Sequence, residues 1–442
     1  MKYVNLASRY YLNTGTRFQR SIIWSMGLIK YAAAKANMEL GLIDRDKAET
    51  IMRVSMDVMH GKYDELINID VYGSGSGTGL NMNINEVISK IIREKYGMEV
   101  HPLEHINLGQ SSNDVVPSAI RLAVLYELEN KLYPSIVGLK DSLTKFIKKY
   151  GNIVKAGRTH LRDALPVSFT HVFGSFLCEI EHLIELYPSI KNYVNRLQLG
   201  GTAVGTGMNT HPDFQDKVIS IIRDYTGLDV HEDYPPRGMK LLTDLLFLSS
   251  YLRNIAVILQ RMCQDIRLMF SGPNTGFNEI DIGMDLPGSS IMPGKKNPVT
   301  AEAIILAASS ISGLDATNLH ASLLGEFELS MGIPIIGYNI IRQIDLCNKA
   351  IIGFTSTLLP NIRINKETCN YYALNSRALI TILTPYIGYD KSIDLLTKVA
   401  NIRDALKKLG YTSDEVDRIL NLEKLVSPGF ISMRRDDKHA DN

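Results

Sequence analysis

One polar loop combines a serine pair, a lysine and an asparagine, which are the residue types that chemistry on a small anion needs. The loop reads GSSIMPGKKNP over residues 288–298 and contains Ser289, Ser290, Lys295 and Asn297. A lysine supplies positive charge, an asparagine supplies hydrogen-bond donors, and a serine hydroxyl acts as a base once its alkoxide is stabilised. The alternative is a surface loop with a basic tip, which the order of residue types disfavours.

The end of this loop predicts the start of a helix. Pro298 stands where the first helical residue is expected, so Asn297 is the predicted N-cap and Glu302 falls in the early turns. We therefore expect Glu302 to lie near the loop that precedes it.

Two further polar loops offer small hydroxyl and amide groups. The first is GSGSGTGLNMNINEV (73–87), with Ser76, Gly77, Thr78 and Asn81. The second is GQSSNDVVPSA (109–119), with Ser111, Ser112 and Asn113. Glycines let the backbone approach a ligand, and a helix predicted to begin near Ser118, after Pro117, adds N–H groups suited to a carboxylate. A flexible linker and a plain turn are the alternatives. The glycine spacing fits neither nucleotide-binding pattern.

A histidine in a fourth polar segment is a candidate proton carrier. The segment KAGRTHLRDALPV (155–167) places Thr159 beside His160. A single histidine is more often structural, but its pKa near neutrality suits general acid–base work. His101 and His105 stand four residues apart without a third ligand, so a zinc site is not predicted.

Long helices must position these loops. Apolar residues between Leu125 and Leu143 recur every three or four positions, which places them on one helix face. Residues 239–270 contain neither Gly nor Pro, so they predict one helix of roughly 48 Å. Its apolar residues cover more than one face and require a bundle, which we expect subunits to share. Strand signals are weak, and INIDVY (67–72) is the best candidate.

The distribution of helices and loops predicts three sequential domains. Residues 1–120 form an N-terminal domain, residues 121–360 a central domain of long helices, and residues 361–442 a small C-terminal helical domain. The expected fold class is all-α.

Composition narrows the classes of partner and compartment. The net charge of +1 leaves no excess of basic residues for a nucleic-acid backbone. Four scattered cysteines fit reduced thiols, the first residues lack an apolar signal region, and no uninterrupted apolar stretch suits a membrane span. We expect a cytoplasmic protein without nucleic-acid or membrane partners.

The loops resemble those of the aspartase/fumarase superfamily. GSSIMPGKKNP is similar to its signature GSSxMPxKxN, and SGTGLNMNINEV, GQSSND, GRTHLRDALP and LGGTAVGTGMNT match its other segments in the same order. The resemblance runs from about residue 14 to about residue 425. It implies a homotetramer built on a central helical bundle, with each active site assembled from loops of three subunits and no metal or other cofactor.

Within this superfamily the resemblance is to the class II fumarases. It implies reversible hydration of fumarate to L-malate, a step of the tricarboxylic acid cycle, through an aci-carboxylate intermediate. Ser289 is then the base, Lys295 and Asn297 stabilise the intermediate, His160 handles the departing hydroxyl, and Glu302 keeps His160 charged. The hydroxyl-rich loops, with Thr159 and Ser290, bind the substrate.

Some residues depart from the fumarase pattern. His101, Pro102, Leu103 and Glu104 replace the usual His-Pro-Asn-Asp of a second anion site, which we keep as a candidate site. Gly79, Leu80 and Gly109 also differ from the family's usual residues. Aspartate ammonia-lyase or another fumarate-releasing lyase is the alternative enzyme, and a non-enzymatic relative is a third reading that the intact reactive residues disfavour.

Overall fold

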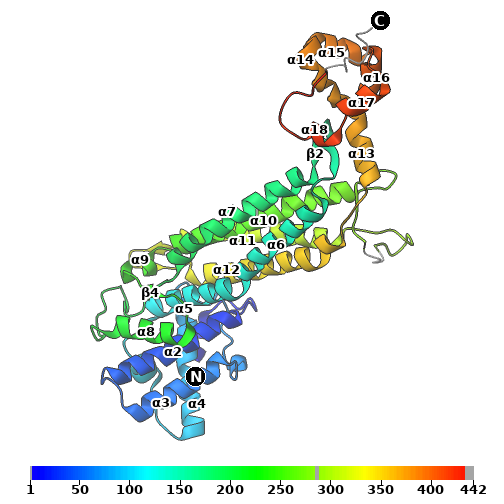
Figure 1. Ribbon diagram of the computed structural model, residues 1–442. Coiled ribbons are helices and arrows are strands. Elements are labelled where there is room, and N and C mark those ends of the chain that lie inside the picture. The colour runs from blue at the N-terminus through cyan, green and yellow to red at the C-terminus, as the bar shows by residue number, and fades with distance from the viewer. Residues whose placement is uncertain (1, 284–287, 434–442) are drawn as a thin grey trace. The chain divides into compact units, whose positions relative to one another are not determined.

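Helices make up most of the chain in the computed structural model, which describes residues 2–283 and 288–433 (Figure 1). The predicted all-α class is confirmed. The chain divides into unit 1 (Met1–Val137, Leu183–Leu259, Leu306–Ile351) and unit 2 (Gly138–His182, Gln260–Ile305, Ile352–Asn442). The boundary between the units falls within five helices: α6 (Tyr133–Tyr150), α7 (Phe169–Val194), α10 (Thr243–Phe270), α11 (Val299–Ser322) and α12 (Ile333–Gly353). The three sequential domains stay a prediction.

In the described part of the chain, unit 1 contains seven helices from the first 240 residues together with parts of the five long helices. Its helices are α1 (Lys2–Ala7), α2 (Arg20–Glu39), α3 (Arg45–Met59), α4 (Thr78–Tyr96), α5 (Ser112–Glu127), α8 (Phe214–Thr226) and α9 (Pro235–Lys240). Short 3-10 turns lie at Ser8–Tyr10 and Asp64–Leu66, and π-helical turns at Pro102–Ile106 and Leu128–Leu132. Two short strand pairs complete it: β3 (Arg196–Leu197) with β4 (His231–Glu232), and β6 (Gly325–Glu326) with β7 (Leu329–Ser330).

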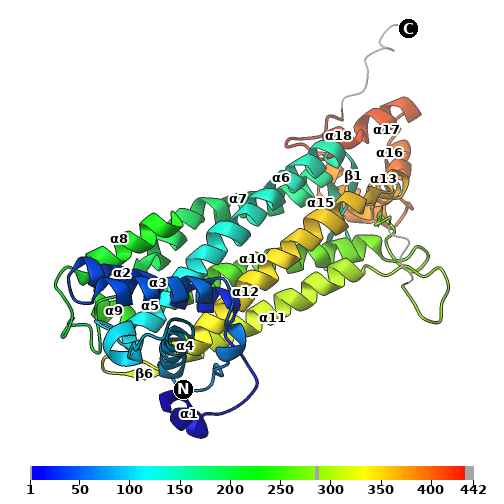
Figure 2. The same ribbon diagram turned by 90° about the horizontal axis from the view of Figure 1, so that it is seen from below.

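Helix α2 lies at the centre of unit 1. It packs against α3, α5 and α8, so it is covered on several sides (Figures 1 and 2). Its apolar residues, such as Ile22, Met26 and Ile29, are fully buried. Because nearly every face meets a neighbour, the helix carries apolar residues all round rather than on one stripe.

A buried ion pair fixes the start of α10. Arg121 on α5 donates to Asp244 through Nε (2.7 Å) and Nη2 (2.9 Å), and both side chains are fully buried. Arg121 Nη1 also donates to Gln198 Oε1 at 3.0 Å, and Nη2 donates to the Leu241 carbonyl at 3.3 Å. The bidentate geometry satisfies both charges without water.

Buried polar side chains hold α10, α11 and α12 together within unit 1. Ser249 donates to Asp315 at 2.7 Å, and Asn318 Nδ2 donates to Gln343 Oε1 at 3.0 Å. Asn339 Nδ2 donates to Asn318 Oδ1 at 2.9 Å. A network whose members satisfy one another specifies which residues face each other in an otherwise apolar bundle.

Unit 2 contains a β-hairpin and the C-terminal helices. The hairpin is β1 (Val154–Thr159) paired antiparallel with β2 (Arg162–Ser168), and β5 (Ile280–Asp281) pairs with β8 (Arg363–Ile364). Its helices are α13 (Lys366–Asn375), α14 (Thr384–Ile387), α15 (Tyr389–Leu396), α16 (Ile402–Lys408), α17 (Ser413–Ile419) and α18 (Leu422–Leu425). A π-helical turn (Phe354–Leu358) and 3-10 turns (Leu359–Asn361, Arg377–Leu383) link them. Leu379, Leu406 and Val416 form part of a separate small core there.

Several boundaries differ from those predicted. The helix expected over 239–270 is broken between α9 and α10, because Leu241 is extended and its carbonyl accepts from Arg121. INIDVY forms no strand; it contributes one isolated bridge between Arg17 and Asp70. The polar loop expected over 73–87 ends at Gly77, because α4 begins at Thr78.

Replacing Arg121 with Met tests the buried pair. We expect the free energy of unfolding to fall by about 3–5 kcal/mol, because the change removes both hydrogen bonds to the buried Asp244 carboxylate and leaves it only the longer ion pair with Arg237, at 3.9 Å. Urea denaturation measures it. The double variant Arg121→Met/Asp244→Leu should regain most of the loss. Arg403→Met, which removes an exposed ion pair with Asp417 (2.7 Å), should cost under about 1 kcal/mol. Equal losses for Arg121→Met and Arg403→Met would contradict this account.

Candidate functional site

The first two polar loops meet in unit 1 at the starts of two helices. Gly77 is the N-cap of α4 and Ser111 is the N-cap of α5. The hydroxyls of Ser76 and Thr78 are 2.6 Å apart, and those of Thr78 and Ser112 are 3.1 Å apart. Two helix N-termini and a chain of hydroxyls therefore converge, which is an arrangement that favours a carboxylate.

A buried carboxylate, Asp114, ties this point to a third loop. Asp114 Oδ1 accepts from the Ser111 N–H at 2.8 Å and completes a capping box. Its Oδ2 accepts from the N–H groups of Gly200 (3.1 Å) and Thr202 (3.0 Å). Asn113 Nδ2 adds a bond to the Ala203 carbonyl at 2.8 Å. Burial raises the pKa of Asp114 to about 7, against the opposing effect of these N–H donors.

A buried lysine supports the same region from α2. The Lys30 ammonium is fully buried and donates to Asn107 Oδ1 at 3.1 Å and Gln110 Oε1 at 2.9 Å. Asn107 Oδ1 also accepts from Asn81 Nδ2 and Asn85 Nδ2, each at 3.1 Å. Burial lowers the pKa of Lys30 to about 7, and the attraction of Asp114 opposes this shift. The network fixes the orientation of the asparagine side chains.

These groups surround a cavity of about 660 Å³ within unit 1. Its polar lining includes Thr78, Asn81, Ser111, Ser112 and Thr202. The cavity is therefore large enough for a small dicarboxylate. Uncharged polar groups from three separate segments of the chain line it, together with the Glu104 carboxylate.

The candidate second anion site borders this cavity. Leu103 and Glu104 line it, and Pro102 begins the π-helical turn beside them. His101 Nδ1 accepts from the N–H groups of Leu103 (3.3 Å) and Glu104 (3.1 Å), so this ring nitrogen caps the turn. The Glu104 carboxylate lies 3.8 Å from the same ring nitrogen. Binding of an anion there stays a prediction.

The loop that carries Ser289 lies in unit 2 and is closed at its base. Gly288 N–H donates to the Lys295 carbonyl at 2.9 Å, and the Asn297 side-chain amide donates to the Gly288 carbonyl. A Cβ at Gly288 would lie 2.5 Å from the Lys295 oxygen, so only glycine fits. Ser289 Oγ accepts from the Met292 N–H at 2.9 Å, while Ser290 and Lys295 are exposed. Pro287, which precedes the loop, lies outside the described residues.

The predicted cap at Asn297 is wrong by one residue. Helix α11 begins at Val299, and the Pro298 carbonyl accepts from the Glu302 N–H at 3.0 Å. The Asn297 amide closes the loop instead of capping the helix, because Gly288 brings a carbonyl within its reach.

His160 occupies the tip of the unit 2 hairpin. Thr159 pairs with Arg162, so His160 and Leu161 are the two turn residues. Both have positive φ, +52° and +57°, a conformation that costs non-glycine residues roughly 1–2 kcal/mol each. Thr159 and His160 are exposed.

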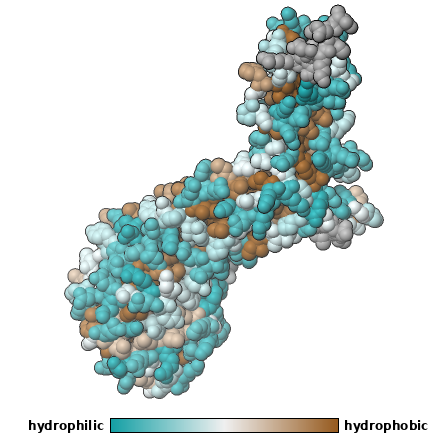
Figure 3. Space-filling view, viewed as in Figure 1, coloured by the Kyte–Doolittle hydropathy of each residue, from teal (hydrophilic) through white to brown (hydrophobic). Residues whose placement is uncertain are grey.

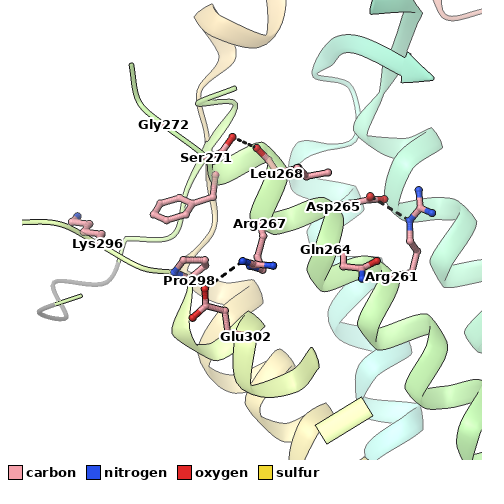
Figure 4. A pocket seen from close by; sticks show the side chains of 11 residues that line it. Arg261, Gln264, Asp265, Arg267, Leu268, Ser271, Gly272, Lys296, Pro298 and Glu302 are labelled. Carbon is pink, nitrogen blue, oxygen red and sulfur yellow. Dashed lines mark hydrogen bonds and ion pairs between the residues drawn. The ribbon is translucent and has the colours of Figure 1, made fainter. Parts of the chain in front are cut away.

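Glu302 faces a basic neighbour in unit 2. Its Oε1 lies 3.5 Å from Arg267 Nη2, at the edge of a cavity of about 630 Å³ lined also by Arg261 and Lys296 (Figure 4). Figure 4 shows Asp265 directed toward Arg261, to which it is paired at 3.3 Å. The predicted pairing of Glu302 with His160 stays a prediction.

The predicted site residues thus fall into two groups. Unit 1 brings together Ser76, Gly77, Thr78, Asn81, Ser111, Ser112 and Asn113. Unit 2 contains Ser289, Ser290, Lys295, Asn297, Glu302, Thr159 and His160. Sequence reasoning missed Lys30 and Asp114. A single lysine inside the apolar run SIIWSMGLIKYAAA was the available signal for Lys30, and an acid three residues after a serine was the signal for Asp114.

Comparison with known proteins identifies the class. The family described as Lyase matches residues 1–313. A class II fumarate hydratase of Saccharolobus solfataricus is 49% identical over 97% of this chain and 99% of its own length. An aspartate ammonia-lyase of Helicobacter pylori is 34% identical over 94% of this chain and 91% of its own. A crystal structure of a class II fumarase from Schistosoma mansoni is 28% identical, with a TM-score of 0.91, over 96% of this chain and 94% of that one.

The chain belongs to this lyase family. Its resemblance to the aspartase/fumarase superfamily, read from the loops, is therefore confirmed. Its close relatives within that superfamily include class II fumarate hydratases.

Gly77→Ala tests how the helix start positions Thr78. Gly77 has φ +72°, and an added Cβ would lie 2.7 Å from Val116 Cγ1. We expect the free energy of unfolding to fall by about 1–3 kcal/mol and kcat/KM for L-malate to fall about 100-fold, because Thr78 is displaced. Urea denaturation and initial rates measure both.

Gly97→Ala is the matched control, because Gly97 ends the same helix with φ +63° and nothing lies within 4 Å of an added Cβ. It should lose about 1 kcal/mol through backbone strain and keep its kcat/KM. An equal loss of activity in both variants would show that α4, rather than the loop, is what matters.

Proposed function

We propose that this protein catalyses the reversible hydration of fumarate to L-malate. The observation that carries the proposal is the 49% identity to a class II fumarate hydratase, since it extends over 97% of the chain and so includes every candidate loop. The substrate is a dianion, so its site needs hydrogen-bond donors and positive charge. The two groups of residues supply both.

The unit 1 cavity binds the carboxylates. Thr78 and Ser112 present hydroxyls at two helix N-termini, where N–H groups and the helix dipole favour negative charge. Lys30 adds a positive charge beneath the asparagine cluster, where it is fully buried and attracted by Asp114. Uncharged donors held in fixed directions suit a substrate whose charge moves between carbon and oxygen during reaction.

The unit 2 residues carry the proton transfers. Ser289 removes a proton from the carbon beside a carboxylate of L-malate, which leaves an aci-carboxylate whose oxygens bear the charge. Lys295 and Asn297 stabilise that charge. The hydroxyl then departs as water with a proton from His160, and Glu302 favours the charged form of His160. Thr159 and Ser290 orient the substrate. No metal or other cofactor is assigned a role in this scheme.

Exposed apolar helices support the proposal of a homotetramer. Leu306 and Leu319 on α11 are 69% and 48% exposed, and Phe247 and Val257 on α10 are each 52% exposed. Figure 3 shows apolar side chains reaching the surface along the long helices. Within residues 2–283 and 288–433, α11 is the only helix that is long and apolar enough to cross a membrane, yet only 28% of its most apolar stretch is buried. Other copies of the chain cover these faces in our proposal.

The same proposal explains why the reactive residues are exposed in a single chain. His160, Lys295 and Ser290 face solvent, whereas proton transfer from carbon requires a dry site. Loops from three subunits complete and close each site. We further propose a cytoplasmic enzyme of the tricarboxylic acid cycle, without nucleic-acid or membrane partners. Four unpaired cysteines support a reducing compartment.

Turnover of L-malate tests the reaction. Purified protein should raise the absorbance of fumarate when L-malate is supplied, and L-aspartate should give no such signal. Turnover of L-aspartate alone would assign the chain to the aspartate ammonia-lyases, to which it is also similar. Ser289→Ala should lower kcat by at least about 1,000-fold while gel filtration shows the oligomer intact. An active Ser289→Ala variant would remove Ser289 as the base.

Breaking the α11 surface tests the assembly. Leu306→Glu combined with Leu319→Glu should dissociate the tetramer, because burial of two charges in an apolar interface is unfavourable, and activity should fall with it. Light scattering gives the mass. Leu42→Glu is the control, since Leu42 is 45% exposed but lies in the loop between α2 and α3, away from α11 in the sequence. A fully active monomer would refute shared sites.

A further inference from the structure

The His160 turn is strained, and nothing in its own two side chains relieves that strain. Two-residue hairpin turns in which both residues have positive φ favour Asn-Gly, whereas this turn carries His160 and Leu161. Leu161 is 64% exposed in this chain, so its side chain is not held by a core. A strained turn persists only where the surrounding structure fixes it. The residues at the base of the hairpin must therefore hold the turn in this conformation.

A bulge turns two basic side chains of β1 toward one partner. Lys155 and Arg158 are three residues apart, so an unbroken strand would point them to opposite faces. The pairing register with β2 shifts between Ala156 and Arg158. Gly157 makes this shift possible, because a Cβ there would lie 2.4 Å from the Leu165 oxygen. The bulge brings both cations to the same carboxylate, Glu279.

Glu279 is a fixed acceptor. Its side chain is fully buried, with Oε1 at 2.8 Å from Arg158 Nη1 and Oε2 at 3.2 Å from Lys155 Nζ. Its backbone N–H donates to the Met269 carbonyl at 2.8 Å, and its carbonyl accepts from the Asn365 N–H at 2.9 Å. The backbone of Glu279 is thus bonded to the end of α10 and the start of α13. Its carboxylate, through Lys155 and Arg158, holds the hairpin against both.

The Arg158 guanidinium is restrained on its faces as well. It lies 4.0 Å from the centre of the Phe277 ring and 5.5 Å from that of Tyr372. Such stacking leaves the planar group little freedom to rotate. Because Arg158 is two residues before His160, a fixed Arg158 side chain restricts the positions that the His160 backbone can adopt.

We infer that Glu279 is a positioning residue for His160, acting through Arg158 and Lys155. The inference rests on the proposed role of His160 in proton transfer. Glu279 binds the base of the hairpin by two charged contacts and thereby keeps a strained turn in the one conformation that presents the imidazole. Glu279 itself touches neither substrate nor the reacting atoms.

Glu279→Gln tests the inference, because glutamine keeps the shape and one acceptor but loses the charge. We expect kcat for L-malate to fall by about 30- to 100-fold, as displacing a catalytic group by about 1 Å does. KM should change by less than about 3-fold, because the carboxylate-binding donors lie on other loops. The measurement uses the assembled full-length protein.

A double-variant cycle separates positioning of His160 from a general loss of structure. In a His160→Asn background, Glu279→Gln should lower kcat by less than about 3-fold, since the group that it positions is already absent. Equal losses in the two backgrounds would overturn the inference. So would a Glu279→Gln variant with unchanged kcat. Should Glu279→Gln fail to assemble, Glu279→Asp, which keeps the charge but shortens its reach, enters the same cycle with the same criteria.

Asp315→Asn is the matched control for removing a buried carboxylate. Asp315 accepts from Ser249 and Arg253 in unit 1 and has no contact with the hairpin in the described residues. It should keep kcat within about 3-fold, and a loss as large as that of Glu279→Gln would overturn the inference. Failure of the proposed function is distinguishable, because the unmodified protein would then not turn over L-malate at all.

Discussion

The candidate binding cavity depends on how one buried carboxylate is satisfied. Asp114 has no access to solvent, so the donors that replace its water must come from the protein. They come from the start of α5 and from Gly200 and Thr202, which are far away in the sequence. The hydrogen bonds that satisfy the Asp114 carboxylate therefore also bring these segments together. Without the Asp114 carboxylate, no hydrogen bond to this acid would hold the 200–206 loop beside the start of α5, where Ser112 lies.

Buried ions of this kind contribute little net stability, because the cost of removing charges from water offsets most of their attraction. An apolar core would hold the segments together at least as well. It would not, however, define the direction of each N–H group and hydroxyl, which hydrogen bonds to a buried charge do. Lys30 illustrates the point, since its ammonium orients Asn107 and, through it, Asn81. Charge is located beneath the site, where it sets geometry and field together.

The sequence predicted the fold class and the chemical residue types because both depend on local patterns. The apolar positions Leu125, Leu132 and Leu143 are all fully buried, as their spacing indicated. Helix starts were harder. Asn81, Asn83 and Asn85 read as loop residues, yet they lie within α4 because Asn107 and the Leu66 carbonyl accept from their amides. The start of α5 at Ser112 rather than Ser118 follows from the capping box, which outweighs Pro117 in the second turn.

The β-hairpin could not be predicted for a related reason. Its first strand, VKAGRT, carries two cations and a glycine, which argue against a buried strand on any local scale. What holds it in place is Glu279, more than a hundred residues later, whose carboxylate accepts a hydrogen bond from Arg158 and forms an ion pair with Lys155. Asp114 and Glu279 thus do the same work in their respective units: each is a buried acid that joins distant segments beside exposed reactive groups. Sequence patterns predict least well those parts of the molecule in which a buried charge is paired with residues distant in the sequence. These parts also position the candidate functional side chains.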